Sequence, residues 1–556
     1  MIGYVCKYTP VELVESFGIP TQKLEPSVSR FDHADRAMHP NVCSFARAIL
    51  EEALQKGTKD ILLVNCCDSI RRLFDVMKAH GSFGFLEILD LPRKTTGCAV
   101  TLFENELRRL VPKLEEFSGK PFDSRAFEQR VEKTAVAQSD LQEATSPRVA
   151  LVGARAKREV VEMLQEAGLS ICLDTTCTGN ARHFFLQEDR PSLNAYASAL
   201  LNQVPCMRMA QTNGRLEALE QVKGLEGIVY HTLKFCDFYG YDFSELSWKS
   251  SLPMLKIETD YTLSSTGQLQ TRAEAFAESL RAKKGLEPVA KPGPKTGGLV
   301  AGIDIGSTST NVVILDHHRR IVAFSIEKTG AKSEKGAKNA LDSALQKAGI
   351  RREQLEKVVA TGYGRNAIPF ADETVTEISC HAKGALFFDS SVRTIIDIGG
   401  QDSKAIRVDG NGDVKDFAMN DKCAAGTGKF LEMMAHTLEL EIARMGPLSL
   451  DARESIHISS MCTVFAESEV ISLIAQNKEP SDIVRGLCDS IASRTVSLVK
   501  RVNPEERFMM TGGVAKNVGV VESLERKLST RIVVPFEPQV VGAVGAALFA
   551  LEKVGW

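Results

Sequence analysis

Several features common in other protein classes are missing from this 556-residue sequence. No run of about 18 apolar residues appears, and the start has neither a basic segment nor a small-residue cleavage site, so we expect a cytoplasmic protein with no membrane partner. The 68 basic and 71 acidic residues leave a net charge of −3, which gives no electrostatic reason to expect nucleic acid. The length of the chain indicates a multidomain globular protein, and a polyanion is not expected as its partner.

Local cysteine motifs are also missing, although the chain has 13 cysteines. No two cysteines have Cys-x-x-Cys spacing, which argues against a zinc ribbon or a ferredoxin-like site. In a reducing compartment an odd number of thiols is not a disulfide framework. Metal binding or redox chemistry is therefore the leading interpretation, with ligands that the fold gathers from distant parts of the chain.

A basic stretch rich in proline and glycine, residues 281–298, divides the chain and is typical of a linker. Before it, strand-like runs such as "ILLVN" and "GIVYHTL" alternate with helical patterns, which predicts parallel α/β sheets. We expect two Rossmann-like cluster subdomains, 1–118 and 147–280, joined by a helical crossover over 119–146. Residues 299–556 form the last predicted domain.

Three glycine-containing turns follow the linker in order. "GIDIGSTSTNVVILD" joins two strands by a Gly-Ser-Thr turn, "IIDIGGQDSKAIRVD" repeats the arrangement, and "MMTGGVAKN" ends a strand with paired glycines. Such turns present backbone N–H groups to phosphate, and a nearby aspartate can hold hydrated Mg²⁺. The candidate residues are Asp304, Gly306, Ser307 and Thr308 in the first turn, Asp397, Gly399, Gly400, Gln401 and Asp402 in the second, and Gly512 and Gly513 in the third.

These turns resemble those of the actin, sugar kinase and Hsp70 ATPase superfamily. The resemblance implies two ribonuclease-H-like lobes that clamp ATP between two phosphate loops and an adenosine loop. Asp304 and Asp397 would then be catalytic, with Gln401 or Asp402 positioning the attacking water. The predicted fold class is therefore α/β: two Rossmann-like parallel-sheet subdomains followed by an actin/Hsp70-like two-lobed ATPase.

Within that superfamily, "ATGYGR", "EISCHAKGA", "NDKCAAGTGKFLEMMA" and "SSMCTVFAESEVISLI" resemble the activator ATPases of 2-hydroxyacyl-CoA dehydratases and the related benzoyl-CoA reductase ATPase subunits. The resemblance implies that Cys423 and Cys462 from each of two subunits hold one 4Fe-4S cluster at a homodimer interface. Each cysteine precedes a helix, whose N-terminus favours a thiolate. Cys380 and Cys488 fall within helical patterns and are expected to pack in the core.

The first half resembles the dehydratase D-component family, and more closely its double-cubane cluster branch, in "GYVCKYTPVEL", "NVCSFAR", "NCCDSIRRLF", "VPCMRM", "KFCDFYGYD" and "IETDYTLSSTGQLQTRAEAFAE". That branch implies six cysteine ligands for two linked 4Fe-4S units: Cys6, Cys43, Cys67, Cys177, Cys206 and Cys236. We assign Cys43, Cys67 and Cys236 to one cubane and the others to the second. Cys66 could replace Cys67, while Cys98 and Cys172 are read as free thiols.

Together the two resemblances predict an ATP-hydrolysing iron–sulfur reductase. The ATPase, with ATP/ADP and Mg²⁺, would pass low-potential electrons from its own cluster to the double cubane, which would reduce a small inert molecule. Ferredoxin or flavodoxin would be the donor. The alternatives are a fused 2-hydroxyacyl-CoA dehydratase with a single cubane, an ATP-dependent cluster chaperone or sensor, and a small-molecule kinase.

Overall fold

The computed structural model describes residues 1–136, 146–177, 191–210, 213–262, 266–282, 298–420, 426–454, 456–458 and 463–556. By their contacts, residues 1–273 and 274–556 form two compact units. Most of the predicted linker, at 283–297, lies outside the described residues, and helix α11 (Thr266–Ala282) extends to the start of that segment. No helix in the described ranges is both long and apolar enough to cross a membrane.

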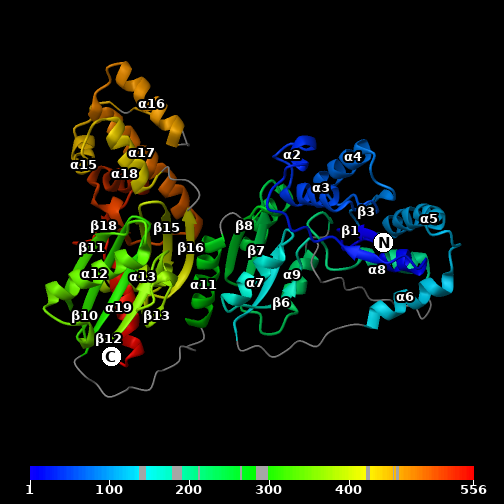
Figure 1. Ribbon diagram of the computed structural model, residues 1–556, viewed down its shortest axis with the longest axis horizontal. Helices are drawn as coiled ribbons and strands as arrows, with labels where there is room; N and C mark the ends of the chain where they lie inside the picture. Colours follow the sequence, from blue (N-terminus) through cyan, green and yellow to red (C-terminus); the bar gives the residue numbers. More distant parts are fainter. Residues whose placement is uncertain are drawn as a thin grey trace. The chain divides into compact units, whose positions relative to one another are not determined.

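The first unit contains two parallel sheets of four strands each (Figure 1). The first has the order β2-β1-β3-β4, and the second has the order β6-β5-β7-β8. Their strands are β1 (Ile2–Tyr4), β2 (Thr21–Lys23), β3 (Ile61–Val64), β4 (Leu86–Leu89), β5 (Arg148–Gly153), β6 (Ser170–Asp174), β7 (Gly227–Leu233) and β8 (Met254–Thr259). Continuous buried runs such as β3 are what a parallel sheet covered on both faces requires. This confirms the predicted parallel α/β class of the first half.

Helices connect these strands in the βαβ manner. They are α1 (Val11–Ser16), α2 (Ala34–Ala37), α3 (Ser44–Lys56), α4 (Asp68–His80), α5 (Gly97–Ser118), α6 (Ser124–Val136), α7 (Arg158–Glu166), α8 (Leu193–Leu201), α9 (Asn213–Glu220) and α10 (Asp237–Lys249). Three of them, α3, α4 and α5, end at glycines with left-handed backbone, Gly57, Gly81 and Gly119. A residue with a Cβ would be strained there, so these glycines fix where each helix stops.

One segment within 147–280 packs with the first sheet rather than the second. Helix α8 lies against α5, as Figure 1 also shows, and Tyr196, Leu200 and Cys206 share a buried cluster with Ile2 and Cys6. Tyr196 also donates a hydrogen bond to buried Glu12 of α1. The chain thus returns from the second sheet to the first, which brings Cys206 to the end of β1.

The second unit contains two five-stranded sheets of identical topology. One has the order β11-β10-β9-β12-β13 and the other β16-β15-β14-β17-β18, with the first three strands in sequence antiparallel and the last two parallel to the first. The strands are β9 (Leu299–Ile305), β10 (Ser309–Asp316), β11 (Ile321–Lys328), β12 (Leu355–Thr361), β13 (Glu373–Thr374), β14 (Thr394–Ile398), β15 (Ser403–Val408), β16 (Val414–Asn420), β17 (Phe508–Thr511) and β18 (Ile532–Val533). This repeat confirms the predicted two-lobed, ribonuclease-H-like ATPase fold.

The helices of the second unit are α12 (Ser333–Ala348), α13 (Glu377–Phe388), α14 (Gly428–Thr437), α15 (Ile442–Leu450), α16 (Thr463–Ala475), α17 (Pro480–Val499), α18 (Val518–Leu528) and α19 (Val541–Lys553). Helices α13 and α19 pack closely because glycines line their crossing. A Cβ on Gly545 would lie 1.8 Å from the Cys380 carbonyl oxygen, and one on Gly384 would lie 2.0 Å from that of Val541. The two backbones therefore touch directly.

This crossing predicts a large effect from one methyl group. We expect Gly545→Ala to lower the free energy of unfolding of the second unit by about 1–3 kcal/mol, because the added Cβ must push two helices apart. Trp248 and Trp556 are the chain's two tryptophans, so Trp556 fluorescence during urea unfolding in a Trp248→Phe background reports this unit. As a control, Gly410→Ala meets its nearest atom at 3.5 Å and should change little. Equal stability of the two variants would contradict the packing argument.

Candidate functional site

Thiols gather where the strands of the first unit end. Cys6 follows β1, Cys66 and Cys67 follow β3, Cys177 follows β6, and Cys236 follows β7. In parallel α/β sheets the carboxyl ends of the strands share one edge, which is where ligands bind. The structure thus brings together residues more than two hundred positions apart in the chain.

Three thiols of the first unit are the N-cap residues of helices. Cys43 is the N-cap of α3, Cys67 of α4 and Cys236 of α10, and each of these helices has 13 residues. The partial positive charge of a helix N-terminus favours an anion beside it. These are the three residues that the sequence analysis assigned to one cubane.

The thiols interact with one another in pairs. A hydrogen bond from Cys66 lowers the pKa of Cys6 below its usual value, although burial opposes the shift. A hydrogen bond from Cys236 likewise lowers the pKa of Cys43 against burial. The donor's pKa is raised in both pairs. In each pair one thiol therefore has a lowered pKa and its partner a raised one.

Cys177 and Cys206 complete the group from the second sheet and the returning segment. Burial raises the pKa of Cys177, and the charges of Cys67, Cys43 and Cys206 raise it further. The N–H of Cys206 donates to the hydroxyl of Tyr8 over 3.3 Å. The structure thus places all six predicted ligands, and Cys66 as well, in one neighbourhood, which we call the thiol cluster.

A buried cation lies beside the thiol cluster. The Lys7 side chain is 5% exposed and its ammonium donates to the Val204 carbonyl, two residues before Cys206. Burial lowers its pKa, while the charges of Cys206, Cys6 and Cys177 oppose this shift. A positive charge here offsets part of the negative charge that several thiolates would carry.

The thiol cluster fits a polynuclear cofactor better than a single ion. All eleven described cysteines are free thiols. Within the described part of the chain, no three His, Cys, Asp or Glu side chains are grouped so as to hold one metal ion. An ion needs every ligand at one point, whereas each thiolate of an iron–sulfur cluster binds a different iron. Seven thiols from six parts of the fold are compatible with the second requirement.

The remaining described cysteines lie away from this group. Cys98 is exposed in the first turn of α5, and Cys172 donates to the Val149 carbonyl at 3.4 Å. Cys380 and Cys488 are fully buried in α13 and α17, as expected for core residues. Cys423 and Cys462 lie outside the described residues.

In the second unit, the two predicted phosphate loops touch. Gly306 donates its N–H to the Ser309 carbonyl at 2.9 Å, which closes the first turn, and Gly399 donates to the Asp402 carbonyl at 3.0 Å, which closes the second. A Cβ on Gly400 would lie 2.0 Å from the Thr308 hydroxyl oxygen. Glycine is therefore required at position 400 for the two loops to approach each other this closely.

Four acidic side chains and one lysine lie next to these loops. Lys404, on β15, is buried, with its Nζ 3.0 Å from Asp397 Oδ2 and 3.4 Å from Glu377 Oε1, and it also pairs with Asp402. Burial alone would lower the pKa of Lys404, but attraction to these carboxylates outweighs it and raises the pKa. The lysine joins the carboxyl end of β14 to α13.

Asp304 and Asp397 lie in opposite electrostatic environments. Burial raises the pKa of Asp304 to about 6, with Glu377 and Asp397 adding to the shift. Burial also acts on Asp397, but His381 and Lys404 outweigh it and hold the pKa of Asp397 below its ordinary range. His381 Nδ1 lies 3.3 Å from the Thr511 hydroxyl, which donates to Asp397 at 2.9 Å. A divalent cation would relieve the excess negative charge at Asp304.

The glycine pair after β17 lies beside the same aspartate. Gly512 has φ +83°, and a Cβ there would lie 2.4 Å from the Ile398 carbonyl oxygen and 2.9 Å from Asp397 Oδ1. Asn517 then caps α18 by accepting the N–H groups of Gly519 and Val520, each at 3.1 Å. The turn is thus held between the second sheet and a capped helix.

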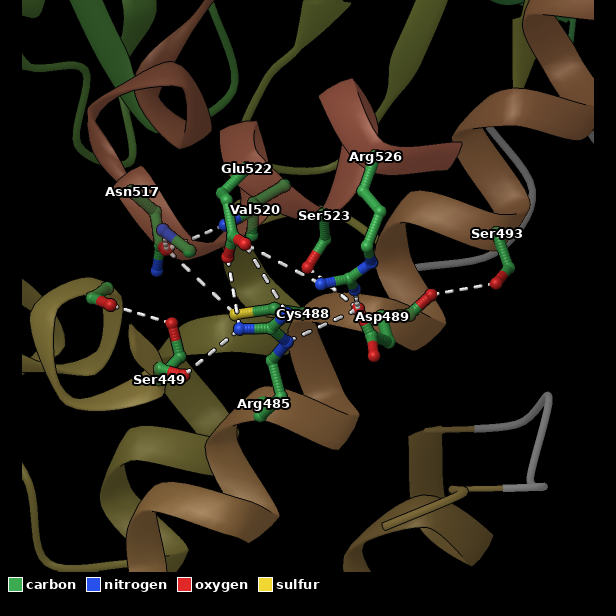
Figure 2. Close-up of polar contacts among 12 residues, drawn as sticks. Ser449, Arg485, Cys488, Asp489, Ser493, Asn517, Val520, Glu522, Ser523 and Arg526 are labelled. Atoms are coloured by element: carbon green, nitrogen blue, oxygen red, sulfur yellow. Dashed lines mark hydrogen bonds and ion pairs between the residues drawn. The ribbon is translucent and has the colours of Figure 1, made fainter. Parts of the chain in front are cut away.

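Figure 2 shows how α17 and α18 are joined around this cap. Cys488 lies 4.0 Å from Asn517 Oδ1, and burial raises the pKa of its thiol to about 12. Arg485 lies 3.0 Å from Glu522, and Ser523 donates to Asp489 at 2.8 Å. These contacts fix the helix that follows the predicted adenosine loop.

Comparison with known proteins relates the two halves of the chain to two different families. The model of the BadF/BadG/BcrA/BcrD ATPase family matches residues 301–550. The 2-hydroxyisocaproyl-CoA dehydratase activator of Clostridioides difficile is 46% identical over 252 residues, which are 45% of this chain and 94% of that protein. The chain belongs to the BadF/BadG/BcrA/BcrD ATPase family. This confirms the resemblance that the phosphate loops and cysteine segments carried.

The first half matches a second family model, that of the 2-hydroxyglutaryl-CoA dehydratase D-component, at residues 6–150 and 133–280. The (R)-2-hydroxyglutaryl-CoA dehydratase activating ATPase of Acidaminococcus fermentans is 44% identical over 45% of this chain and 96% of that protein. The crystal structure of component A of that dehydratase aligns at 43% identity over 47% of this chain and all of that chain, with a TM-score of 0.45. One chain therefore joins a D-component part to an activator-type ATPase of this family.

Sequence reasoning missed four side chains of the nucleotide site: Glu377, His381, Lys404 and Thr511. Lys404 lies two residues after Asp402, but β15 also contains Ser403 and Arg407, so a lysine in this strand did not stand out. Glu377 and His381 belong to the quoted segment "EISCHAKGA", but only the fold places α13 against Asp397. Gln401, in contrast, is exposed at the tip of its loop.

The raised pKa of Asp304 predicts a gain in stability on removing its charge. We expect Asp304→Asn to raise the free energy of unfolding at pH 7.5, without Mg²⁺ or nucleotide, by an amount on the order of 1–3 kcal/mol. A raised carboxyl pKa destabilises the fold above about pH 6, so the gain should shrink toward pH 4.5. Urea unfolding at both pH values measures it, with exposed Asp342→Asn as control. A loss of stability at pH 7.5 would contradict the assignment.

Proposed function

We propose that this protein uses ATP hydrolysis to drive low-potential electrons onto an iron–sulfur centre held by the thiol cluster of its first half. From there the electrons would pass to a small, inert substrate. The observation that carries the proposal is the gathering of seven free thiols in a chain that also contains an activator-type ATPase. An iron–sulfur centre bound there would supply one-electron chemistry at a potential that protein charges and hydrogen bonds tune.

We keep the division of the six ligands that the family resemblance implies, and some contacts support it. Cys43, Cys67 and Cys236 are each the N-cap of a helix, and Cys43 is hydrogen-bonded to Cys236. Both observations support these three residues as one set. Cys6 bonds with Cys66 and its charge acts on Cys206, which supports Cys6 and Cys206 in the second set. Cys177 is assigned to that set by the family resemblance alone, since the charges of Cys67 and Cys43 act on it as well as that of Cys206. Because Cys66 also bonds with Cys67, it lies between the sets, and its thiol is the natural reserve ligand.

The second phosphate loop has a direct connection to the predicted cluster segment of the ATPase. The N–H groups of Gly428 and Lys429, in the first turn of α14, donate to the carbonyls of Gly399 and Gly400 at 2.9 and 2.8 Å. Cys423 lies five residues before α14, and Cys462 directly precedes α16. Any shift of Gly399 and Gly400 between ATP and ADP states would therefore pull on the helix behind Cys423.

Three exposed apolar side chains on the surface of α16 support the proposed homodimer. Phe465 is 67% exposed, Ile471 54% and Ile474 42%, all on the helix that follows Cys462. Such side chains on one helix are typical of a surface that a protein partner covers. A second copy that covers this face would bring the two Cys462 residues, and with them the proposed shared 4Fe-4S cluster, together.

Coupling electron transfer to ATP hydrolysis is useful only when the acceptor has a lower reduction potential than the donor. For one electron, about 59 mV corresponds to about 1.4 kcal/mol, so an uphill step of about 300 mV costs about 7 kcal/mol. Ferredoxin or flavodoxin are the proposed donors. The names of the relatives support a second candidate, dehydration of a 2-hydroxyacyl-CoA by a single cubane, which needs fewer thiol ligands than the first unit gathers.

The metal content distinguishes these two functions. Two linked cubanes plus half of a shared cluster predict about ten iron atoms per chain, whereas one cubane plus that half predicts about six. Iron and acid-labile sulfide in anaerobically purified protein give the count. We expect about ten, with a fall in Cys43→Ser and none in the exposed control Cys98→Ser. A value of two or less would refute a redox role for the thiol cluster.

The gating role of the ATPase is tested at Asp397. We expect Asp397→Asn to abolish Mg-ATP-dependent consumption of dithionite by the metal-loaded chain, because the amide loses the pairing of this position with Lys404. Iron content should stay at the wild-type level. Asp342→Asn, exposed on α12, is the matched control and should behave as wild type. Unchanged consumption in Asp397→Asn would show that electron delivery does not need ATP.

A further inference from the structure

Helix α11 belongs to the first half by sequence but not entirely by packing. The D-component match extends to residue 280, whereas residues from Glu274 onward are part of the second unit. Ala275 shares a buried cluster with Ile378 and Ala382 of α13, and Phe276, Ala277 and Leu280 are also buried. The last two turns of α11, Glu274–Ala282, are therefore an integral part of the ATPase unit.

The first polar anchor of this segment is Glu278. Its carboxylate accepts the Thr376 backbone N–H at 3.1 Å and also accepts the hydroxyl groups of Thr376 and Ser379. Thr376 is the N-cap of α13. A carboxylate at this end of a helix satisfies otherwise unpaired N–H groups and interacts favourably with the helix dipole. Glu278 thus fixes the start of α13. Glu377, the first residue of this helix, contacts Lys404.

The second anchor is Glu274, which pairs with Arg365. Arg365 is only 3% exposed, and its Nη1 donates to the Gly362 carbonyl at 3.2 Å. Gly362 has φ +84°, and a Cβ there would lie 2.5 Å from Asp304 Oδ1. Glu274 therefore supports the turn that touches the first catalytic candidate.

Two separate routes thus lead from one face of α11 to the nucleotide site. One runs through Thr376 and Glu377 to Lys404, and the other through Arg365 and Gly362 to Asp304. Glu274 and Glu278 are four residues apart, so they project from the same side of the helix. We propose that Glu274 and Glu278 are positioning residues for ATP hydrolysis, through which the D-component part of the chain acts on its ATPase.

This arrangement is a property of the fused chain. The 252 residues aligned with the C. difficile activator already account for 94% of that protein, close to the 250 residues of the ATPase match. The 6% of that relative outside the alignment is shorter than the stretch from the start of α11 to residue 298 in this chain. In the present chain, Arg365, Thr376 and Ser379 contact two glutamates of a helix whose sequence matches the other family's model as far as residue 280.

The test uses the full metal-loaded chain and Mg-ATP, and it depends on the ATPase part of the proposed function. We expect Glu278→Gln and Glu274→Gln each to lower kcat about tenfold while KM for Mg-ATP changes less than about twofold, because they shift catalytic groups without touching ATP. Glu334→Gln, exposed in the first turn of α12, is the matched control. Equal kcat in all four proteins, or a rise in KM alone, would overturn the proposal.

Amide hydrogen exchange separates positioning from loss of structure. In the wild type, adding Mg-ADP or a non-hydrolysable Mg-ATP analogue should give different protection of residues 266–282. In Glu274→Gln/Glu278→Gln this difference should vanish while the protection of β9 and β14 is kept. Identical protection of α11 in both nucleotide states of the wild type would refute the link. Absence of hydrolysis in the wild type would instead refute the ATPase proposal, and the exchange experiment would still decide the link.

Discussion

Both halves of this protein depend on one constraint: parallel strands expose their carboxyl ends along a single edge of the sheet. In the first unit such edges of two sheets carry Cys6 and Cys66 on one and Cys177 and Cys236 on the other. In the second unit Asp304 lies at the end of β9 in one sheet, and Asp397 and Thr511 lie at the ends of β14 and β17 in the other. Neither site needs a contiguous motif, because the topology fixes which residues become neighbours. The absence of Cys-x-x-Cys pairs is therefore a consequence of the fold.

Ionisable groups accumulate at the carboxyl ends of the strands in both units, and a buried lysine lies beside them in each unit. Lys404 joins three carboxylates beside the phosphate loops, and Lys7 lies next to the thiol cluster. Burial raises the pKa of Asp304, and the charges of Glu377 and Asp397 add to the shift because one lysine does not neutralise four acids. Buried like charges cost free energy until a counter-charge arrives. The nucleotide site is thus built to gain stability when a cation binds with its phosphates.

Sequence patterns predicted the parts of this structure that local chemistry determines. Apolar runs predicted β3, β5 and β7, and the glycine turns predicted the loops in which Gly400 and Gly512 leave no room for a side chain. The helical patterns around Cys380 and Cys488 predicted buried thiols. In each case the residue type and its immediate neighbours carry the reason for the structure.

The parts that sequence did not reveal depend on packing between distant segments. The return of α8 to the first sheet has no local signal, because an apolar helix fits either sheet. Strands buried on both faces give no alternation, so nothing in β15 marked Lys404 as facing α13. The change of packing partner within α11 is likewise invisible, since the helix is continuous across the boundary at 273.

Joining two protein families in one chain has two distinct physical effects. A linker alone raises the effective concentration of donor near acceptor, and any linker of suitable length would do so. Helix α11 adds something a linker cannot, because Glu278 and Glu274 hold the beginning of α13 and the turn at Gly362. A displacement of that helix must move groups that touch Asp304 and Lys404. Proximity acts in every nucleotide state, whereas a helix built into the ATPase unit would, under the proposal above, let the D-component part of the chain influence hydrolysis.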